Sequence, residues 1–392
     1  MDQASTVSLR EDPRCRGANA GLALALGGGG ARAAYQAGVL RALGRRCPAL
    51  APRLMTGVSA GAINVAHLAN RASSFTAACD SLFDVWSSIE VQRVFEARTL
   101  RLAYHALCVL SKATFGVAPS FEPIRGMVDA RPLRAFLSEA YGGERLSGIR
   151  SNIASGQLDA VAILALQYAT GRTTSFCEGR HVVDWDRPLR RSVQTELRLD
   201  HVLASSALPL FFPPVEVDGE WFGDGGVRLI APLAPAVHLG AERILAISTR
   251  YRPSEAEAAQ KRFEGAPSPA NIGGNLFSAI FLDALDQDAL TLERINGLVR
   301  STPAEAHGPL RPIELFVVRP SVDLGRLANE FEARLPGMFR FLTRRLGTRP
   351  SRSQELLSTV LFQHDYVREL LRIGEQDGEA HAGALQRFLQ GP

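Results

Sequence analysis

The stretch that decides the fold is GLALALGGGGARAAYQAGVL, residues 21–40. Alternating leucine and alanine at the start of this stretch predict a buried strand, and residues 33–43 predict a helix. Between them stand four consecutive glycines, residues 27–30. Such a run indicates a sharp turn, or a backbone that another group approaches very closely. The loop could hold a phosphate, a nucleotide or an oxygen that becomes negative during a reaction.

The same pattern recurs directly downstream. Residues 52–56 predict a second strand and residues 60–70 a second helix, with a tight turn between them. Two strand–helix units in succession are typical of an α/β fold with a mostly parallel sheet that helices cover. Later apolar runs predict further strands, or a hairpin in the second case, over 158–172, 215–226, 243–249 and 313–320.

Beyond residue 320 the chain becomes rich in helix-forming residues. Apolar side chains recur at helical spacing between residues 356 and 371. Ser351 and Gln354 have the spacing of a capping box, which predicts where a helix begins. The chain is therefore expected to consist of a flexible tail over 1–20, an α/β domain over 21–320 and a helical C-terminal extension over 321–392.

Composition excludes several classes of protein. A net charge of only +4 on 392 residues argues against a dedicated nucleic-acid binder. The five cysteines are scattered and form no C-x-x-C pair, so neither a disulfide framework nor a zinc site is expected. There is no apolar signal segment, and no stretch approaches the ~20 apolar residues of a spanning helix. These features predict a cytoplasmic protein that at most lies on a membrane surface.

A possible nucleophile lies in the tight turn between the second strand and helix. Residues 57–61 read Gly-Val-Ser-Ala-Gly, the G-x-S-x-G pattern. A serine in a sharp strand-to-helix turn is held in a strained conformation, and small residues on both sides let the strand and helix pass closely. The hydroxyl of Ser59 would then lie at a helix N-terminus, where backbone N–H groups favour negative charge.

A serine hydroxyl needs a base, and the sequence leaves two arrangements open. The first is a Ser-His-Asp triad, for which His67, His238 and His364 are the histidines to weigh. The second is a Ser-Asp dyad. Asp224 follows the returning strand of the predicted hairpin and is surrounded by glycines that would permit close approach. A turn aspartate without any catalytic role has the same local pattern.

Three blocks now stand in order along the chain: GGGGAR, GVSAG and DGG. Together they resemble the patatin-like phospholipases, serine lipid acyl hydrolases that use a Ser-Asp dyad. The resemblance extends over about residues 22–250 and includes HVLASSALPLFFPPVEV, residues 201–217. It implies a three-layer α/β/α fold and an enzyme that cleaves fatty-acyl esters at a membrane surface without a metal or cofactor.

Carried over residue by residue, the resemblance implies that Ser59 is the nucleophile and Asp224 the base. It implies an oxyanion hole made by the glycine loop with its neighbouring arginine, which are Gly28, Gly29, Gly30 and Arg32. Arg32 would add fixed positive charge there or brace the loop. The glycines that support the two motifs are Gly57, Gly61, Gly225 and Gly226. One residue departs from the family pattern, because Ala33 stands where a further glycine is usual.

Two rival functions keep a place beside this hypothesis. One is an esterase or acyltransferase that uses a Ser-His-Asp triad. The other is a non-catalytic binder of a nucleotide or a lipid. The glycine loop fits the dinucleotide pattern G-x-G-x-x-G poorly, because Ala33 replaces the third glycine and no acidic residue ends a strand about 20 residues on. No G-K-[ST] follows the loop, which excludes a P-loop.

Two segments have the composition of lipid-contacting elements. Residues 100–119 are apolar with basic ends and could form a lid or wall beside the site. Residues 334–352 contain six arginines and no acidic residue, with apolar side chains on one helical face. An ordinary packed helix with a solvated arginine face has the same pattern.

Overall fold

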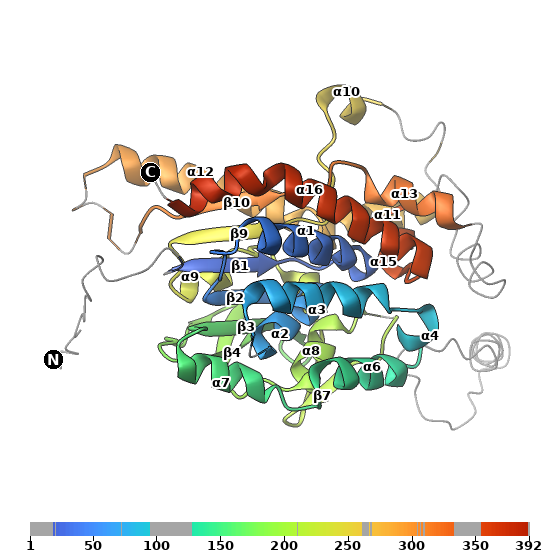
Figure 1. The fold of residues 1–392 in the computed structure, drawn as a ribbon, viewed down its shortest axis with the longest axis horizontal. Helices are drawn as coiled ribbons and strands as arrows, with labels where there is room; N and C mark the ends of the chain where they lie inside the picture. Colours follow the sequence, from blue (N-terminus) through green and yellow to red (C-terminus); the bar gives the residue numbers. More distant parts are fainter. Residues whose placement is uncertain are drawn as a thin grey trace.

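The computed structural model describes residues 19, 21–71, 73–94, 128–209, 211–260, 266, 269–303, 305, 307–308, 310–332 and 354–390. Within these ranges ten strands form one sheet (Figure 1). The strands are β1 (Leu22–Leu26), β2 (Leu54–Val58), β3 (Ala160–Gln167), β4 (Arg172–Gly179), β5 (Asp186–Arg187), β6 (Arg190–Gln194), β7 (Val215–Val217), β8 (Glu220–Asp224), β9 (Arg243–Ile247) and β10 (Glu314–Val318).

The described residues also form helices, including those predicted over 33–43 and 60–70. They are α1 (Ala33–Arg46), α2 (Ala60–Asn70), α3 (Phe75–Ser87), α4 (Val91–Val94), α6 (Arg131–Tyr141), α7 (Ser147–Ser155), α8 (Leu199–Ser206), α9 (Ala234–His238), α10 (Glu255–Ala258), α11 (Pro269–Phe281), α12 (Ala284–Ser301), α13 (Leu324–Glu332), α15 (Gln354–Val360) and α16 (His364–Gln390). Short 3₁₀ turns occupy Gly30–Arg32 and Gly225–Arg228.

The sheet is mostly parallel, as predicted. Its order is β10-β9-β1-β2-β3-β4-β6-β5, and the first five of these strands run parallel to one another. Strand β4 returns antiparallel to β3. The hairpin of β7 and β8 is present as expected, with Asp218 and Gly219 at positive φ in its turn. Strand β8 also pairs with the end of β3, and this pairing positions the candidate site.

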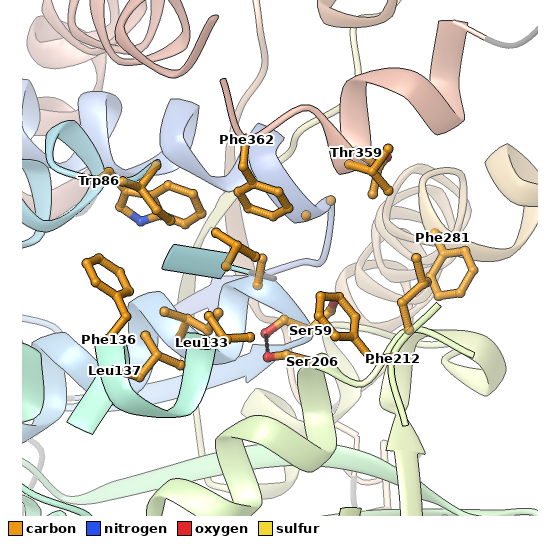
Figure 2. A pocket seen from close by; sticks show the side chains of 18 of the residues that line it. Ser59, Trp86, Leu133, Phe136, Leu137, Ser206, Phe212, Phe281, Thr359 and Phe362 are labelled. Atoms are coloured by element: carbon orange, nitrogen blue, oxygen red, sulfur yellow. Dashed lines mark hydrogen bonds between the residues drawn. The ribbon is translucent and has the colours of Figure 1, made fainter. Parts of the chain in front are cut away.

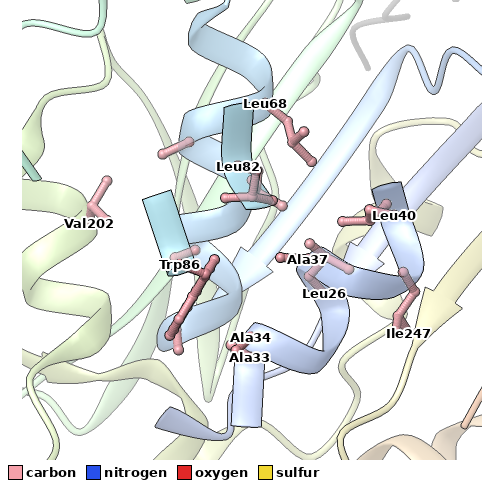
Figure 3. Close-up of a cluster of buried hydrophobic side chains, with 14 of the residues drawn as sticks. Leu26, Ala33, Ala34, Ala37, Leu40, Leu68, Leu82, Trp86, Val202 and Ile247 are labelled. Carbon is pink, nitrogen blue, oxygen red and sulfur yellow. The ribbon is translucent and has the colours of Figure 1, made fainter. Parts of the chain in front are cut away.

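Helices cover both faces of the sheet and make three layers. Along β1, Leu22, Leu24 and Leu26 point into the larger apolar core, while Ala23 and Ala25 point into a second core on the opposite face. This alternation follows from the two-residue period of a strand. The larger core packs against α1, α2, α3 and α16, and part of it is shown in Figure 3. The second core packs against α9 and α12. The predicted α/β/α architecture is confirmed.

The C-terminal helix α16 lies along α1 and completes the larger core (Figure 1). Glycines let the two backbones come very close. A Cβ on Gly38 would lie 2.2 Å from the Leu371 carbonyl oxygen, and one on Gly374 would lie 2.2 Å from that of Tyr35. The Tyr35 hydroxyl also donates to Asp377 at 3.0 Å. The C-terminal helices are thus present as predicted, whereas a domain boundary at residue 320 stays a prediction.

Several element boundaries differ from the sequence predictions. The second strand runs from Leu54 to Val58, because it continues until the turn that begins at Ser59. The helical pattern near the C-terminus forms two helices, α15 and α16, which are separated at residues 361–363. The predictions for residues 100–119 and 334–352, for Ser351 and for nearly all of the tail 1–20 lie outside the described residues.

No helix in the described ranges is both long enough and apolar enough to cross a bilayer.

Candidate active site

Ser59 occupies the turn between β2 and α2, as the sequence predicts. Its φ of 55° and ψ of −132° place a non-glycine residue in a conformation that is normally avoided. Helix α8 fixes the turn through hydrogen bonds to the backbone N–H and the carbonyl of Ser59. The Ser205 hydroxyl accepts the Ser59 N–H at 2.9 Å, and the Ser206 hydroxyl donates to the Ser59 carbonyl at 3.1 Å (Figure 2). These two hydrogen bonds therefore hold the turn in its strained conformation.

The glycines on either side of Ser59 are required by close packing. A Cβ on Gly57 would lie 2.7 Å from the Gly61 carbonyl oxygen, and a Cβ on Gly61 would lie 2.3 Å from that of Leu26. Both obstacles are backbone atoms, which cannot move aside as a flexible side chain can.

We therefore predict that Gly61→Ala lowers the free energy of unfolding by about 1–3 kcal/mol or more, the usual effect of overpacking a tight site. Gly27→Ala is the matched control, because a Cβ there has nothing within 4 Å. Its effect should stay within about 0.5 kcal/mol. Denaturant unfolding of the two variants beside the wild type measures both values. Equal stabilities would contradict the packing account.

Asp224 ends β8 and is fully buried. Its Oδ1 atom accepts the Gly226 N–H at 2.8 Å, and its own N–H donates to the Ala207 carbonyl at 2.9 Å. Burial raises the pKa of Asp224 from 3.8 to about 7, against the opposing influence of the Ser59 hydroxyl and the Gly226 N–H. The other oxygen, Oδ2, has no hydrogen-bond partner among the described residues. Ser59 and Asp224 are thus in close proximity without a hydrogen bond of normal geometry.

Strand register brings these two residues together. Strand β2 pairs with β3 up to the Val58–Leu164 pair. Strand β8 pairs with the continuation of β3, beginning at the Asp224–Ala165 pair. Because Leu164 and Ala165 are neighbours, the end of β2 and the end of β8 meet, and Ser59 follows Val58 directly. Ser59 and Asp224, which are 165 residues apart in sequence, thus come together because their strands pair with adjacent residues of β3.

The glycine loop lies over Ser59 and leaves its amide groups free. A Cβ on Gly28 would lie 2.9 Å from the Ser59 Cβ, and Gly29 and Gly30 have φ values of 149° and 54°. The Gly28 carbonyl accepts the Thr249 hydroxyl at 2.9 Å. Within the described ranges, the N–H groups of these three glycines donate to no acceptor. Free, converging N–H groups are what an oxyanion hole requires.

Arg32 makes the contacts of a residue that braces the glycine loop, one of the two roles expected for it. Its buried guanidinium donates to the Ser358 hydroxyl at 2.7 Å and to the Thr249 carbonyl at 3.5 Å, and it forms an ion pair with Glu355. Its backbone N–H donates to Gly29 at 3.1 Å. All of these contacts are directed at the protein, so they do not support Arg32 as a donor in the oxyanion hole. They show that Arg32 connects the glycine loop to α15.

The histidines weighed for a triad lie elsewhere. The Nε2 atom of His67 is 3.1 Å from the Ser81 hydroxyl, and burial lowers the pKa of this histidine to about 4. His238 stacks on Trp185 at 4.8 Å, and His364 begins α16. No histidine is among the described residues that line the cavity at Ser59. No group of three or more metal-ligating side chains occurs in the described ranges either.

A cavity of about 750 Å³, counted with its open mouth, extends from Ser59. Figure 2 shows Trp86 and Phe136 at one end and Phe281 at the other, with Ser59 between them. None of the described lining residues is charged. They are Gly29, Gly30, Ser59, Ala60, Ile63, Val85, Trp86, Ile89, Val94, Leu133, Phe136, Leu137, Ser206, Leu208, Phe212, Phe277, Phe281, Thr359, Val360 and Phe362. An uncharged lining with several aromatic side chains is typical of a site for an apolar ligand.

The family model of the patatin-like phospholipases matches residues 24–237, which contain both Ser59 and Asp224. This is more than half of the 392 residues, and the chain therefore belongs to the patatin-like phospholipase family. No curated protein matches the chain.

Several solved structures are similar to it. Human GIVD cytosolic phospholipase A2 matches over 94% of this chain and 60% of its own, at 15% identity and a TM-score of 0.46. The same human protein with methyl gamma-linolenyl fluorophosphonate matches over 94% and 59%, at 16% identity and a TM-score of 0.44. VipD from Legionella pneumophila matches over 89% and 66%, at 12% and 0.33. The chain thus spans about 60% of the length of the human protein.

Sequence reasoning missed two contributors to this site. Ser205 and Ser206 lie in the quoted stretch 201–217, but nothing in a pair of helical serines predicts that they hold a turn 146 residues away. The approach of α15 to the glycine loop was also unforeseen. A Cβ on Gly30 would lie 2.1 Å from the Thr359 carbonyl oxygen. The run of four glycines was the one feature of the sequence that indicated a close approach to this loop, although it did not indicate which segment approaches.

Proposed function

We propose that this protein hydrolyses fatty-acyl esters of lipids through an acyl-enzyme on Ser59, with Asp224 as the general base. The observation that carries the proposal is the meeting of a strained serine and a fully buried carboxylate beneath free amide groups, beside an uncharged cavity. Family membership supports the same class of reaction. The lipid would be drawn from a membrane or another lipid aggregate.

The first half of the reaction makes the acyl-enzyme. The Ser59 oxygen attacks the ester carbonyl while Asp224 accepts the hydroxyl proton. The N–H groups of Gly28, Gly29 and Gly30 stabilise the negative oxygen of the tetrahedral intermediate. When the carbon–oxygen bond of the ester breaks, Asp224 returns the proton to the leaving alcohol.

The second half releases the fatty acid. Water attacks the acyl-enzyme and transfers a proton to Asp224, and the same amide groups stabilise the second tetrahedral intermediate. This intermediate collapses as the bond to Ser59 breaks, and the proton returns to the serine oxygen. The cavity at Ser59 holds the acyl chain throughout.

Release of free fatty acid by the purified protein tests the proposal. Substrates should include a phospholipid, a lysophospholipid, a galactolipid and neutral glycerides, because each presents the same ester carbonyl. We expect free fatty acid from at least one of them, and none from any of them would overturn the proposal.

The pH dependence follows from the buried carboxyl group. Asp224 must be ionised to accept a proton, and burial raises its pKa to about 7. We expect kcat/KM to increase with pH, with an apparent pKa near 7, and to level off above it. Below that pKa, kcat/KM should decrease about tenfold per pH unit. An acid limb with an apparent pKa near 4 would show that the base is an ordinary exposed carboxylate.

A further inference from the structure

Side chains from outside the glycine loop bind two of its carbonyl groups. The Gly27 carbonyl accepts a hydrogen bond from the Gln36 side-chain amide at 3.0 Å. The next carbonyl, that of Gly28, accepts one from the Thr249 hydroxyl at 2.9 Å. Gln36 lies in α1 and Thr249 lies just beyond β9, and their exposed fractions are 0% and 5%. Two segments that are far apart in the sequence thus hold neighbouring peptide units of the loop.

These bonds also fix the direction of two N–H groups. In a planar trans peptide unit, the carbonyl of one residue and the N–H of the next point in opposite directions. The described residues contain no cis peptide bond. The Gly27 carbonyl therefore fixes the Gly28 N–H, and the Gly28 carbonyl fixes the Gly29 N–H. The third peptide unit is fixed within the loop itself, because the Gly29 carbonyl accepts the Arg32 N–H at 3.1 Å.

The N–H groups fixed in this way lie beside the proposed nucleophile. A Cβ on Gly28 would lie 2.9 Å from the Ser59 Cβ, and Gly29 lines the cavity at Ser59. Within the described ranges, neither the Gly28 nor the Gly29 N–H donates to an acceptor. The carbonyl groups of the loop are therefore occupied by the protein, whereas its N–H groups remain available to an oxygen of the substrate.

The Gln36 side chain is itself held by buried hydrogen bonds. Its amide nitrogen also donates to the Ile247 carbonyl at 3.1 Å, and its amide oxygen accepts the Asn64 amide at 3.0 Å. The Asn64 oxygen in turn accepts the indole N–H of Trp86 at 2.7 Å, and Trp86 stands at one end of the cavity (Figure 2). Both N–H groups of the Gln36 amide are engaged, so the side chain keeps one orientation.

We propose that Gln36 and Thr249 are positioning residues of the oxyanion hole. Each holds a carbonyl of the loop so that the N–H of the following glycine is directed at the negative oxygen that forms at Ser59. This inference rests on the proposed hydrolytic function. Neither side chain is among the described residues that line the cavity at Ser59, so each acts through the loop. Donors that are held in place beforehand need no reorganisation as the charge develops.

Thr249→Val tests the inference with a small change in shape, because a methyl group replaces the hydroxyl. The Gly28 carbonyl then loses this donor, and the following N–H is no longer fixed. We expect kcat to decrease by about 10- to 100-fold at an unchanged KM, somewhat less than the about 10²–10³-fold that removal of an oxyanion donor costs. Thr249→Ser keeps the hydroxyl and should recover most of the lost kcat, although it removes a buried methyl group.

Thr76→Val is the matched control. The Thr76 hydroxyl also donates to a glycine carbonyl at 2.9 Å, that of Gly44, but Thr76 lies in α3 and does not line the cavity at Ser59. This variant loses the same kind of hydrogen bond outside the site and should keep the kcat of the wild type. Steady-state kinetics on one fatty-acyl ester measure kcat and KM for all of these proteins.

A transition-state analogue separates positioning from a general loss of structure. With a trifluoromethyl ketone, the Ser59 oxygen adds to the ketone carbon, its proton passes to Asp224, and the ketone oxygen becomes negative. A methyl ketone with the same apolar chain occupies the cavity without forming a stable oxyanion. In Thr249→Val we expect the inhibition constant of the trifluoromethyl ketone to increase by the factor by which kcat decreases, and that of the methyl ketone to stay constant.

Gln36→Met is the second variant, because it keeps the length of the side chain but cannot donate, and it should show the same pattern. If Thr249→Val does not fold, Thr249→Ala replaces it. Equal kcat values for Thr249→Val and Thr76→Val, or an equal loss of affinity for both ketones, would overturn the inference while the proposed function stands. If the wild-type protein hydrolyses no fatty-acyl ester, the proposed function is wrong and the inference is wrong with it.

Discussion

Ser59→Ala is expected to decrease ester hydrolysis by about 10⁴-fold or more, the scale seen when a nucleophile is removed from a serine hydrolase. The reason is chemical: in the proposed reaction the Ser59 oxygen carries the acyl group, and alanine keeps the shape of the turn except for this one oxygen. The Ser59 hydroxyl also faces a buried carboxylate rather than contributing to the core, so folding should be retained. Free fatty acid release by wild type and variant measures the change.

Ser206→Ala is the matched control for this experiment. Ser206 lines the same cavity and donates to the Ser59 carbonyl, but it lies outside the proposed reaction steps. We expect this variant to keep its activity within about tenfold of the wild type, because it loses only the ordinary hydrogen bonds of this hydroxyl to the Ser59 and Val202 carbonyls. If Ser59→Ala retained activity and Ser206→Ala lost it, the nucleophile would be Ser206 and the proposed role of Ser59 would be wrong.

Asp224→Asn is the second prediction with a large expected effect. An amide has nearly the same shape as the carboxyl group but cannot accept the serine proton, so kcat should decrease by about 10²–10⁴-fold. The acid limb near pH 7 should disappear from the residual activity, because the group that titrates there has been removed. Kinetics across pH for wild type and variant check both expectations. Unchanged activity in Asp224→Asn, combined with loss on changing a histidine, would favour a Ser-His-Asp enzyme.

The same substitution should affect stability in the opposite direction. The folded-state pKa of Asp224, about 7, exceeds its ordinary value of 3.8, so folding favours the protonated form. The resulting stabilisation is complete below pH 3.8 and is lost as pH rises to about 7, by about 1.4 kcal/mol for each unit of pKa difference. Asp224→Asn removes this penalty. We expect its advantage in stability over the wild type to be larger at pH 8 than at pH 5.

Local patterns predicted the elements of the fold well. The alternation of leucine and alanine in β1 predicts a strand buried on both faces, and both faces carry a core. The G-x-S-x-G spacing predicts the turn at Ser59 because close packing leaves no room for a Cβ at Gly57 or Gly61. Contacts between residues that lie far apart in the sequence could not be predicted in this way. The meeting of Ser59 and Asp224 depends on the register of β8 on β3, which no local pattern specifies. The residues alone left a Ser-Asp dyad open beside a triad, and only the family resemblance favoured the dyad.

The position of Arg32 illustrates the same limit. Next to a glycine loop, an arginine can contribute charge to a reaction or stabilise the loop, and the adjacent sequence is identical in both cases. Its partners, Glu355 and Ser358, are more than 320 residues away in the C-terminal part of the chain. Only tertiary structure shows that this arginine connects the glycine loop to α15.

The most direct measurement is the rate at which a fluorophosphonate modifies Ser59, followed by mass spectrometry of the intact protein and of its peptides. We expect one adduct per chain, located on Ser59. The adduct should form at least about 100-fold more slowly in Asp224→Asn than in the wild type, because the serine has lost its base. An adduct on another residue, or equal rates of modification at Ser59 in both proteins, would contradict the claim that these two residues act together.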